Sequence, residues 1–219
     1  MGEIILQAES LKKAYGKRSI LQNISFELKE GEILGVAGEN GTGKSTLLSM
    51  LATIQKPQAG NIYFYGKDIL KEKRSYRKQI GYVPQDIALF EELSGKDNLG
   101  FFGKVCYVPV KELEERIKDV CEITGFPAAD LQRPVAEYSG GMKRKINIGA
   151  ALLHRPKLLL LDEPMANLDE AAEEQVFGAL KCLAGQGTSI VYVGHQINKM
   201  EQFCNQICFI KNGKVVRNK

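Results

Sequence analysis

The sequence predicts an α/β fold with a mainly parallel sheet and an inserted helical lobe. The apolar runs Leu158–Leu161 and Ile190–Val193 show no polar alternation, as expected for parallel strands covered on both faces. Strand-like and helix-like segments alternate in both end portions of the chain, whereas the middle is mostly helical. We therefore expect a single domain, residues 1–219, with a core at 1–89 and 157–219 and a helical lobe at about 90–156.

The N-terminal elements follow from short apolar runs between turn residues. The expected order is strands at Ile4–Ala8, Ile24–Leu28 and Ile33–Ala37, a helix at Lys44–Ala52, and a strand at Asn61–Tyr65 between two glycines.

The middle and C-terminal elements are predicted in the same way. In the helical lobe, one apolar helix face is indicated by the spacing of Val110, Leu113, Ile117, Val120 and Cys121. After it we expect a strand at Leu158–Leu161, a helix at about Asp169–Leu183, a strand at Ser189–Val193, a short helix, and a hairpin at Gln206–Val216. Asn212-Gly213 between the apolar runs of that hairpin is a strong turn signal.

Composition excludes several classes of protein. Of the 219 residues, 44% are hydrophobic and 26% are charged, which is typical of a globular domain rather than a fibrous or disordered chain. The net charge of +4 is spread along the chain, so we expect no nucleic-acid partner. The richest apolar run, Ala150–Leu161, is interrupted by charged residues, and the N-terminus does not resemble a signal peptide. A cytoplasmic location is expected.

A phosphate-binding loop is predicted at residues 38–45, with the sequence Gly38-Glu39-Asn40-Gly41-Thr42-Gly43-Lys44-Ser45. This matches G-x-x-x-x-G-K-[ST] and lies between an apolar strand and a helix. The glycines allow successive backbone N–H groups to point inward, and the helix presents its positive dipole end. Lys44 adds a point charge, and the Ser45 hydroxyl can ligate Mg²⁺. These features together suit a nucleoside triphosphate.

Two carboxylates, Asp162 and Glu163, directly follow the strand Leu158–Leu161. A parallel strand delivers them to the sheet edge at which ligands gather, which is also the edge of the predicted loop. Asp162 is placed to bind Mg²⁺. Glu163, next along the backbone and therefore pointing elsewhere, is a candidate to polarise a water toward the γ-phosphate.

The third motif is Tyr138-Ser139-Gly140-Gly141-Met142, at the start of a helix predicted to run to about Leu153. With the loop before it and Asp162-Glu163 after it, this motif resembles the Leu-Ser-Gly-Gly-Gln signature of the ATP-binding cassette (ABC) ATPase family. The resemblance covers nearly the whole chain. It implies a P-loop NTPase core with a mainly parallel sheet, an N-terminal antiparallel β part and an inserted helical subdomain. Met142 has no side-chain amide to offer a ligand.

The resemblance also implies roles for further residues. Gln85 is similar to the Q-loop glutamine, Asp169 to the last residue of the D-loop, His195 to the switch histidine and Tyr15 to the adenine-stacking aromatic. The implied catalytic residues are Glu163, His195, Gln85 and Lys44, and the implied Mg²⁺ ligands are Ser45, Gln85 and Asp162. The implied ATP contacts are Tyr15, Gly38, Glu39, Asn40, Gly41, Thr42, Gly43, Lys44, Ser45, Thr46, Ser139, Gly140, Gly141 and Asp169.

The family further implies a head-to-tail dimer, in which Ser139 and the helix behind it face the γ-phosphate held by the other copy. We expect a transporter ATPase that works with a second cassette, identical or related, and with transmembrane permease subunits. Such permease subunits are expected because the chain itself shows no span. The expected place is the inner face of the cell membrane. Residues 81–102 are most similar to exporter cassettes, which favours export.

Three alternatives remain open at this point. The first is a soluble ABC ATPase that is not coupled to transport, such as one of the iron–sulfur assembly type. The second is a nucleic-acid mechanoenzyme, although Lys44 and Ser139 are too close in sequence for a long coiled-coil insertion. The third is a catalytically weak binding module, which the joint presence of Lys44, Asp162, Glu163 and His195 disfavours.

Overall fold

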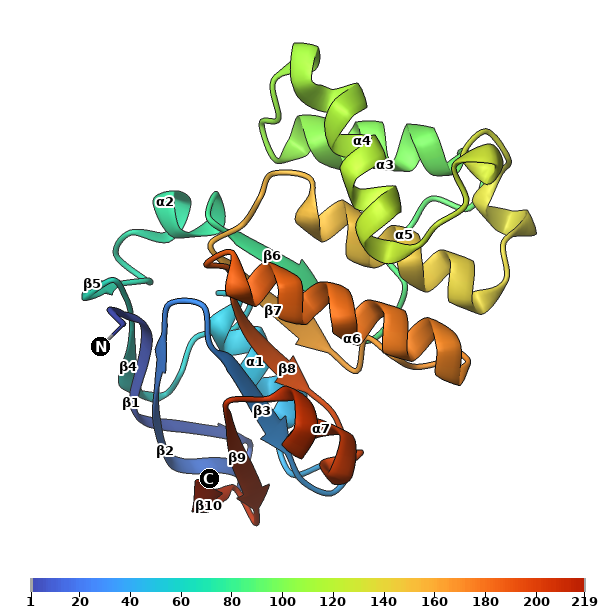
Figure 1. The fold of residues 1–219 in the computed structure, drawn as a ribbon. Coiled ribbons are helices and arrows are strands. Elements are labelled where there is room, and N and C mark those ends of the chain that lie inside the picture. Colours follow the sequence, from blue (N-terminus) through green and yellow to red (C-terminus); the bar gives the residue numbers. More distant parts are fainter. Residues whose placement is uncertain (1, 219) are drawn as a thin grey trace.

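The computed structural model describes residues 2–218, which form two sheets and a group of helices (Figure 1). The smaller sheet has the strand order β2-β1-β4-β5, and its pairs are antiparallel. Its strands are β1 Ile4–Tyr15, β2 Arg18–Lys29, β4 Ala59–Phe64 and β5 Lys67–Asp68. This sheet supplies the N-terminal antiparallel part that was expected.

The larger sheet has the order β10-β9-β3-β8-β7-β6 and is parallel except for the β9–β10 hairpin. Its strands are β3 Ile33–Ala37, β6 Ile80–Val83, β7 Leu158–Asp162, β8 Ser189–Val193, β9 Gln206–Lys211 and β10 Lys214–Asn218. The hairpin turns at Asn212 and Gly213, both with positive φ (52° and 74°), as the Asn-Gly pair predicts. The α/β fold class is confirmed.

Alternate residues of the parallel strands enter two different cores. On β7, Leu158 and Leu160 pack with α1 (Lys44–Leu51) and the antiparallel sheet. Leu159 and Leu161 point to the opposite face, which α6 (Glu170–Gly185) and α7 (Ile197–Phe203) help to cover. Both faces of β7 are therefore buried, which explains why four consecutive residues of this strand are leucine.

The remaining helices are mainly grouped beyond β6, shown in green and yellow in Figure 1. They are α3 Gly95–Val105, α4 Val110–Thr124, α5 Gly140–Leu152 and the 3₁₀ turns Ala128–Asp130 and Val135–Glu137, while the short α2, Lys73–Arg77, precedes β6. Within residues 2–218, no helix combines the length and the apolarity needed to cross a bilayer.

Three predictions about local structure were wrong in detail. Strand β2 begins at Arg18 and not at Ile24. Val110 is not part of the buried face of α4, because it is the first residue of that helix and is 79% exposed, whereas Ile117, Val120 and Cys121 are buried. Strand β1 does not end at Ala8. It continues to Tyr15 through bulges that shift its register against β2, and Ser10 there has a φ of 51°.

Candidate active site

In the loop between β3 and α1, two glycines are in close contact with neighbouring strands. Gly38 has a φ of 151°, and a Cβ atom there would lie 2.4 Å from the carbonyl oxygen of Ile210. Gly43 has a φ of 103°, and its Cβ would lie 2.6 Å from Leu21 of β2. Only glycine fits both the backbone conformation and the space at these positions. The loop is thus held between the two sheets.

Two side chains of α1 point back toward the loop and β7. The Lys44 ammonium is 5% exposed and donates to the carbonyls of Gly38 (2.9 Å) and Glu39 (3.0 Å). The Ser45 hydroxyl lies 3.2 Å from a carboxylate oxygen of Asp162. The N-terminus of α1 has no side-chain cap and no acidic residue in its first turn. Its first N–H groups and its dipole are therefore suited to an anion.

The carboxylates at the end of β7 point to different places. Asp162 is 2% exposed, and burial raises the pKa of its carboxyl, while the bond from Ser45 and the charge of Lys44 oppose that rise. Glu163 has a φ of 47°, and this left-handed conformation turns its side chain away from the strand direction. Its carboxylate lies 3.5 Å from the amide nitrogen of Gln85, which follows β6. Three separate segments thus meet at one sheet edge.

The flanking candidates are more exposed. His195 follows β8, and its imidazole is exposed and makes no hydrogen bond within residues 2–218. Tyr15 is 49% exposed at the end of β1, with its hydroxyl 2.5 Å from the Gln55 side chain. It pairs with Arg18 at the hairpin between β1 and β2.

In the Tyr138–Met142 segment, Ser139 and Gly140 are exposed, whereas Tyr138 is buried. Ser139 caps α5, accepting a hydrogen bond from the Met142 N–H at 3.2 Å. Gly140 and Gly141 approach Asn167 and Leu168. The signature and D-loop segments are therefore in contact. Asp169 uses its carboxylate to cap α6, accepting from the Ala172 N–H at 2.8 Å.

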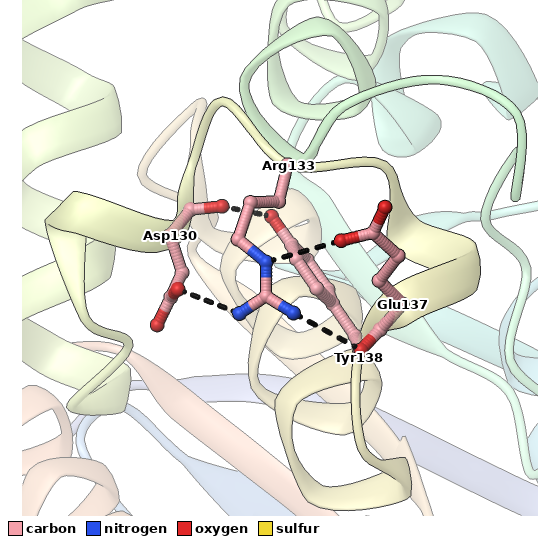
Figure 2. Close-up of polar contacts among 4 residues, drawn as sticks. All are labelled: Asp130, Arg133, Glu137 and Tyr138. Carbon is pink, nitrogen blue, oxygen red and sulfur yellow. Dashed lines mark hydrogen bonds and ion pairs between the residues drawn. The ribbon is translucent and has the colours of Figure 1, made fainter.

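A polar cluster holds the backbone just before Ser139 (Figure 2). The guanidinium of Arg133 bonds Asp130 at 2.8 Å and Glu137 at 3.3 Å. The hydroxyl of Tyr138 donates to the carbonyl of Asp130 at 2.7 Å, while its ring packs against Phe126. A leucine here would supply the packing without that hydrogen bond.

The sequence analysis missed Arg144. This residue lies on α5, one turn and a half after Ser139, and is only 3% exposed. Its guanidinium donates to the carbonyls of Pro84 (3.2 Å) and Gln85 (2.8 Å). In the sequence Arg144 stands between Lys143 and Lys145, and such a run of basic residues is usually a solvated helix face, so no local signal marks Arg144 as buried.

The residues present fit a nucleoside triphosphate with Mg²⁺. The two glycine cradles leave no room for a Cβ, and the uncapped α1 N-terminus and buried Lys44 suit phosphate oxygens. The oxygen donors of Ser45 and Asp162 are the ligand type that Mg²⁺ prefers.

Comparisons with known proteins agree with this geometry. The family model described as "ABC transporter" matches residues 21–166. The linearmycin resistance ATP-binding protein of Bacillus subtilis (strain 168) is 40% identical over 97% of this chain and 68% of that protein. The Nod factor export ATP-binding protein I of Rhizobium sp. (strain N33) is 32% identical over 98% of this chain and 70% of that protein.

A solved structure extends the likeness to a dimer. It is the dimeric post-hydrolysis state of an ATP-binding cassette bound to ADP and Pi, which superimposes with a TM-score of 0.90 at 26% identity and covers 98% of both chains. Fold, motif geometry and relatives agree. The chain belongs to the ABC transporter family and forms an ATP-binding cassette of that family.

Proposed function

We propose that this chain is the ATP-binding and ATP-hydrolysing subunit of an export-type ABC transporter. The observation that carries the proposal is the meeting of Ser45 with Asp162, and of Gln85 with Glu163, at one edge of the parallel sheet. Similarity to ATP-binding proteins named for drug resistance and Nod factor export supports the export direction.

The chain's own residues divide the work at that edge. Lys44 and the N–H groups around Gly43 bind the phosphates, and Ser45, Asp162 and Gln85 hold the metal. Mg²⁺, when bound, neutralises phosphate charge and orients the γ-phosphate for in-line attack.

Glu163 acts as the general base. Its carboxylate orients the attacking water and accepts a proton, a role that general bases fill with rate effects of about 10²–10⁴. The exposed His195 imidazole is free to hydrogen-bond the γ-phosphate from the end of β8. Tyr15 stacks on the adenine with its half-exposed ring.

A second cassette completes the site. Ser139 and Gly140 are exposed at the start of α5, with their donors on the outside of the molecule. In a head-to-tail dimer these residues and the D-loop at Asp169 contact the phosphates held by the other copy. The dimeric state of the solved relative supports this arrangement.

The membrane partner is a permease subunit, which places the cassette at the inner face of the membrane. An apolar patch follows the Q-loop: Phe90 and Phe101 are 45% and 44% exposed and stack edge to face at 5.0 Å. Exposed aromatic pairs of this kind suit a protein partner. Phe90 follows Gln85 closely in the sequence.

Two measurements test the proposal. Purified chain should hydrolyse ATP with Mg²⁺, and EDTA should abolish the activity. Affinity purification from its native membranes should recover a polytopic membrane protein in stoichiometric amount, and a Phe90→Ser/Phe101→Ser variant should lose it while retaining ATP binding. Hydrolysis without any stoichiometric membrane protein would contradict the transport role.

A further inference from the structure

Arg144 occupies a position that neither the loop nor the signature motif accounts for. It is on the same helix as Ser139 but bonds the backbone of Gln85, whose side chain reaches Glu163. Within residues 2–218, it is the only α5 side chain that hydrogen-bonds Gln85. A neighbouring residue, Lys143, also joins α5 to this segment, but through the exposed carboxylate of Glu91.

Burying this guanidinium is costly unless its donors are used. Two of its nitrogens, Nη1 and Nη2, donate to consecutive carbonyls, those of Pro84 and Gln85, and the third, Nε, is buried with no hydrogen-bond partner among residues 2–218. Burial lowers the pKa of Arg144, and the nearby charges of Asp86 and Glu163 act against that shift.

We infer that Arg144 is a positioning residue that links the signature helix to Gln85. Because the planar guanidinium hydrogen-bonds two successive carbonyls, a displacement of α5 moves the backbone of Gln85, and a displacement of that backbone moves α5. Contact of Ser139 with the partner's nucleotide is thereby coupled to the placement of Gln85 beside Glu163. The inference rests on the ATPase role proposed above and adds a residue to it.

A double-mutant cycle tests the link, with ATPase rates of the full chain measured against ATP concentration. Arg144→Met keeps an apolar fit and removes the donors. We expect it to lower kcat about tenfold while KM for ATP stays within about twofold, because the loop that binds ATP is untouched. Gln85→Ala should lower kcat to a similar extent. The double variant should be no slower than Gln85→Ala alone.

Two further variants make the test specific. Lys143→Met is the matched control: the same substitution on the neighbouring residue should leave kcat within about twofold. Arg144→Lys keeps the positive charge but not the planar group that hydrogen-bonds two carbonyls at once. Its kcat should lie between those of the wild type and Arg144→Met. If Arg144→Met does not fold, as judged by thermal unfolding, Arg144→Lys replaces it in the cycle.

Several results would overturn the link. Multiplicative losses in the double variant would mean that Arg144 does not act through Gln85, and an unchanged kcat in Arg144→Met would remove its role entirely. If either result were obtained while the wild type and Lys143→Met still hydrolysed ATP, the proposed ATPase function would be unaffected. Absence of hydrolysis by the wild type would instead remove the proposed function, and this inference with it.

Discussion

The loop edge and the signature end of this cassette are built in contrasting ways. At the loop edge, Lys44 and Asp162 are almost fully buried, and close contacts from both sheets hold the glycines. At the signature end, Ser139 is exposed, caps α5 with its hydroxyl, and directly follows the surface cluster around Arg133. The buried charges and closely packed glycines of the first region suit an anion. The exposed Ser139 of the second region suits the contact with a second cassette that is proposed above.

The largest expected effect comes from removing the buried charge at the loop edge. Lys44→Ala should weaken ATP binding by about 2–5 kcal/mol, since truncating one partner of a buried charge pair costs that much. Isothermal calorimetry measures it, and Lys71→Ala on an exposed site is the control. Unchanged ATP affinity would remove the loop from nucleotide binding.

Glu163→Gln should separate binding from chemistry at the same edge. We expect kcat to fall by about 10²–10⁴ while ATP binding persists, because the amide cannot accept the proton. The trapped ATP should also hold two copies together, which light scattering detects. Glu170→Gln, at an exposed position on α6, is the control. Hydrolysis at the wild-type rate would exclude Glu163 as the base.

Ser139→Arg probes the other region. The bulky cation should block ATP-driven dimerisation, as followed by analytical ultracentrifugation with ATP in the Glu163→Gln background, and leave the ATP affinity of the monomer within about threefold. Ser94→Ala, which removes the comparable serine cap of α3, controls for the loss of a cap alone. Loss of ATP binding by the monomer would contradict the separation of the two regions.

Tyr138→Phe should have the smallest effect. It keeps the ring against Phe126 but leaves the carbonyl of Asp130 without its donor. The expected cost is about 1 kcal/mol in the free energy of unfolding, or about 2–4 °C in Tm for a chain of this size. ATP affinity should not change. A stability equal to that of the wild type would show that the hydroxyl does not hold the signature segment.

Features that depend on neighbouring residues can be predicted from the sequence, whereas contacts between distant segments cannot. The strands Ile33–Ala37 and Ser189–Val193 and the loop at 38–45 are local patterns, and the structure has these strands with the same bounds. Long-range contacts escape such reasoning. The Arg144 side chain bonds residues about sixty positions earlier, and Gly43 is required by its approach to Leu21. The bulges that extend β1 depend on its pairing with β2.

The sequence also predicts local features of the site better than contacts between distant segments. The motif places Lys44 and Ser45 directly, and the meeting of Ser45 with Asp162 follows from parallel strands that end at one edge. The contact of Gly140 and Gly141 with Asn167 and Leu168 depends on how α5 packs. The capping bond of Asp169 is local, but no pattern distinguishes a cap from a nucleotide contact. The catalytic roles of Lys44, Gln85, Glu163 and His195 and the ATP contacts of Thr46 and Tyr15 stay predictions.

Mixing two inactive variants tests most directly whether each site is shared between copies. Lys44→Ala and Ser139→Arg should each hydrolyse ATP at a small fraction of the wild-type rate. Because neither variant forms an ATP-driven dimer with itself, the dimers in an equal mixture are mixed, and each of them has one site with an intact loop and an intact signature. We expect the mixture to recover up to about half of the wild-type rate per subunit. A mixture with only the average of the two separate rates would contradict the shared site.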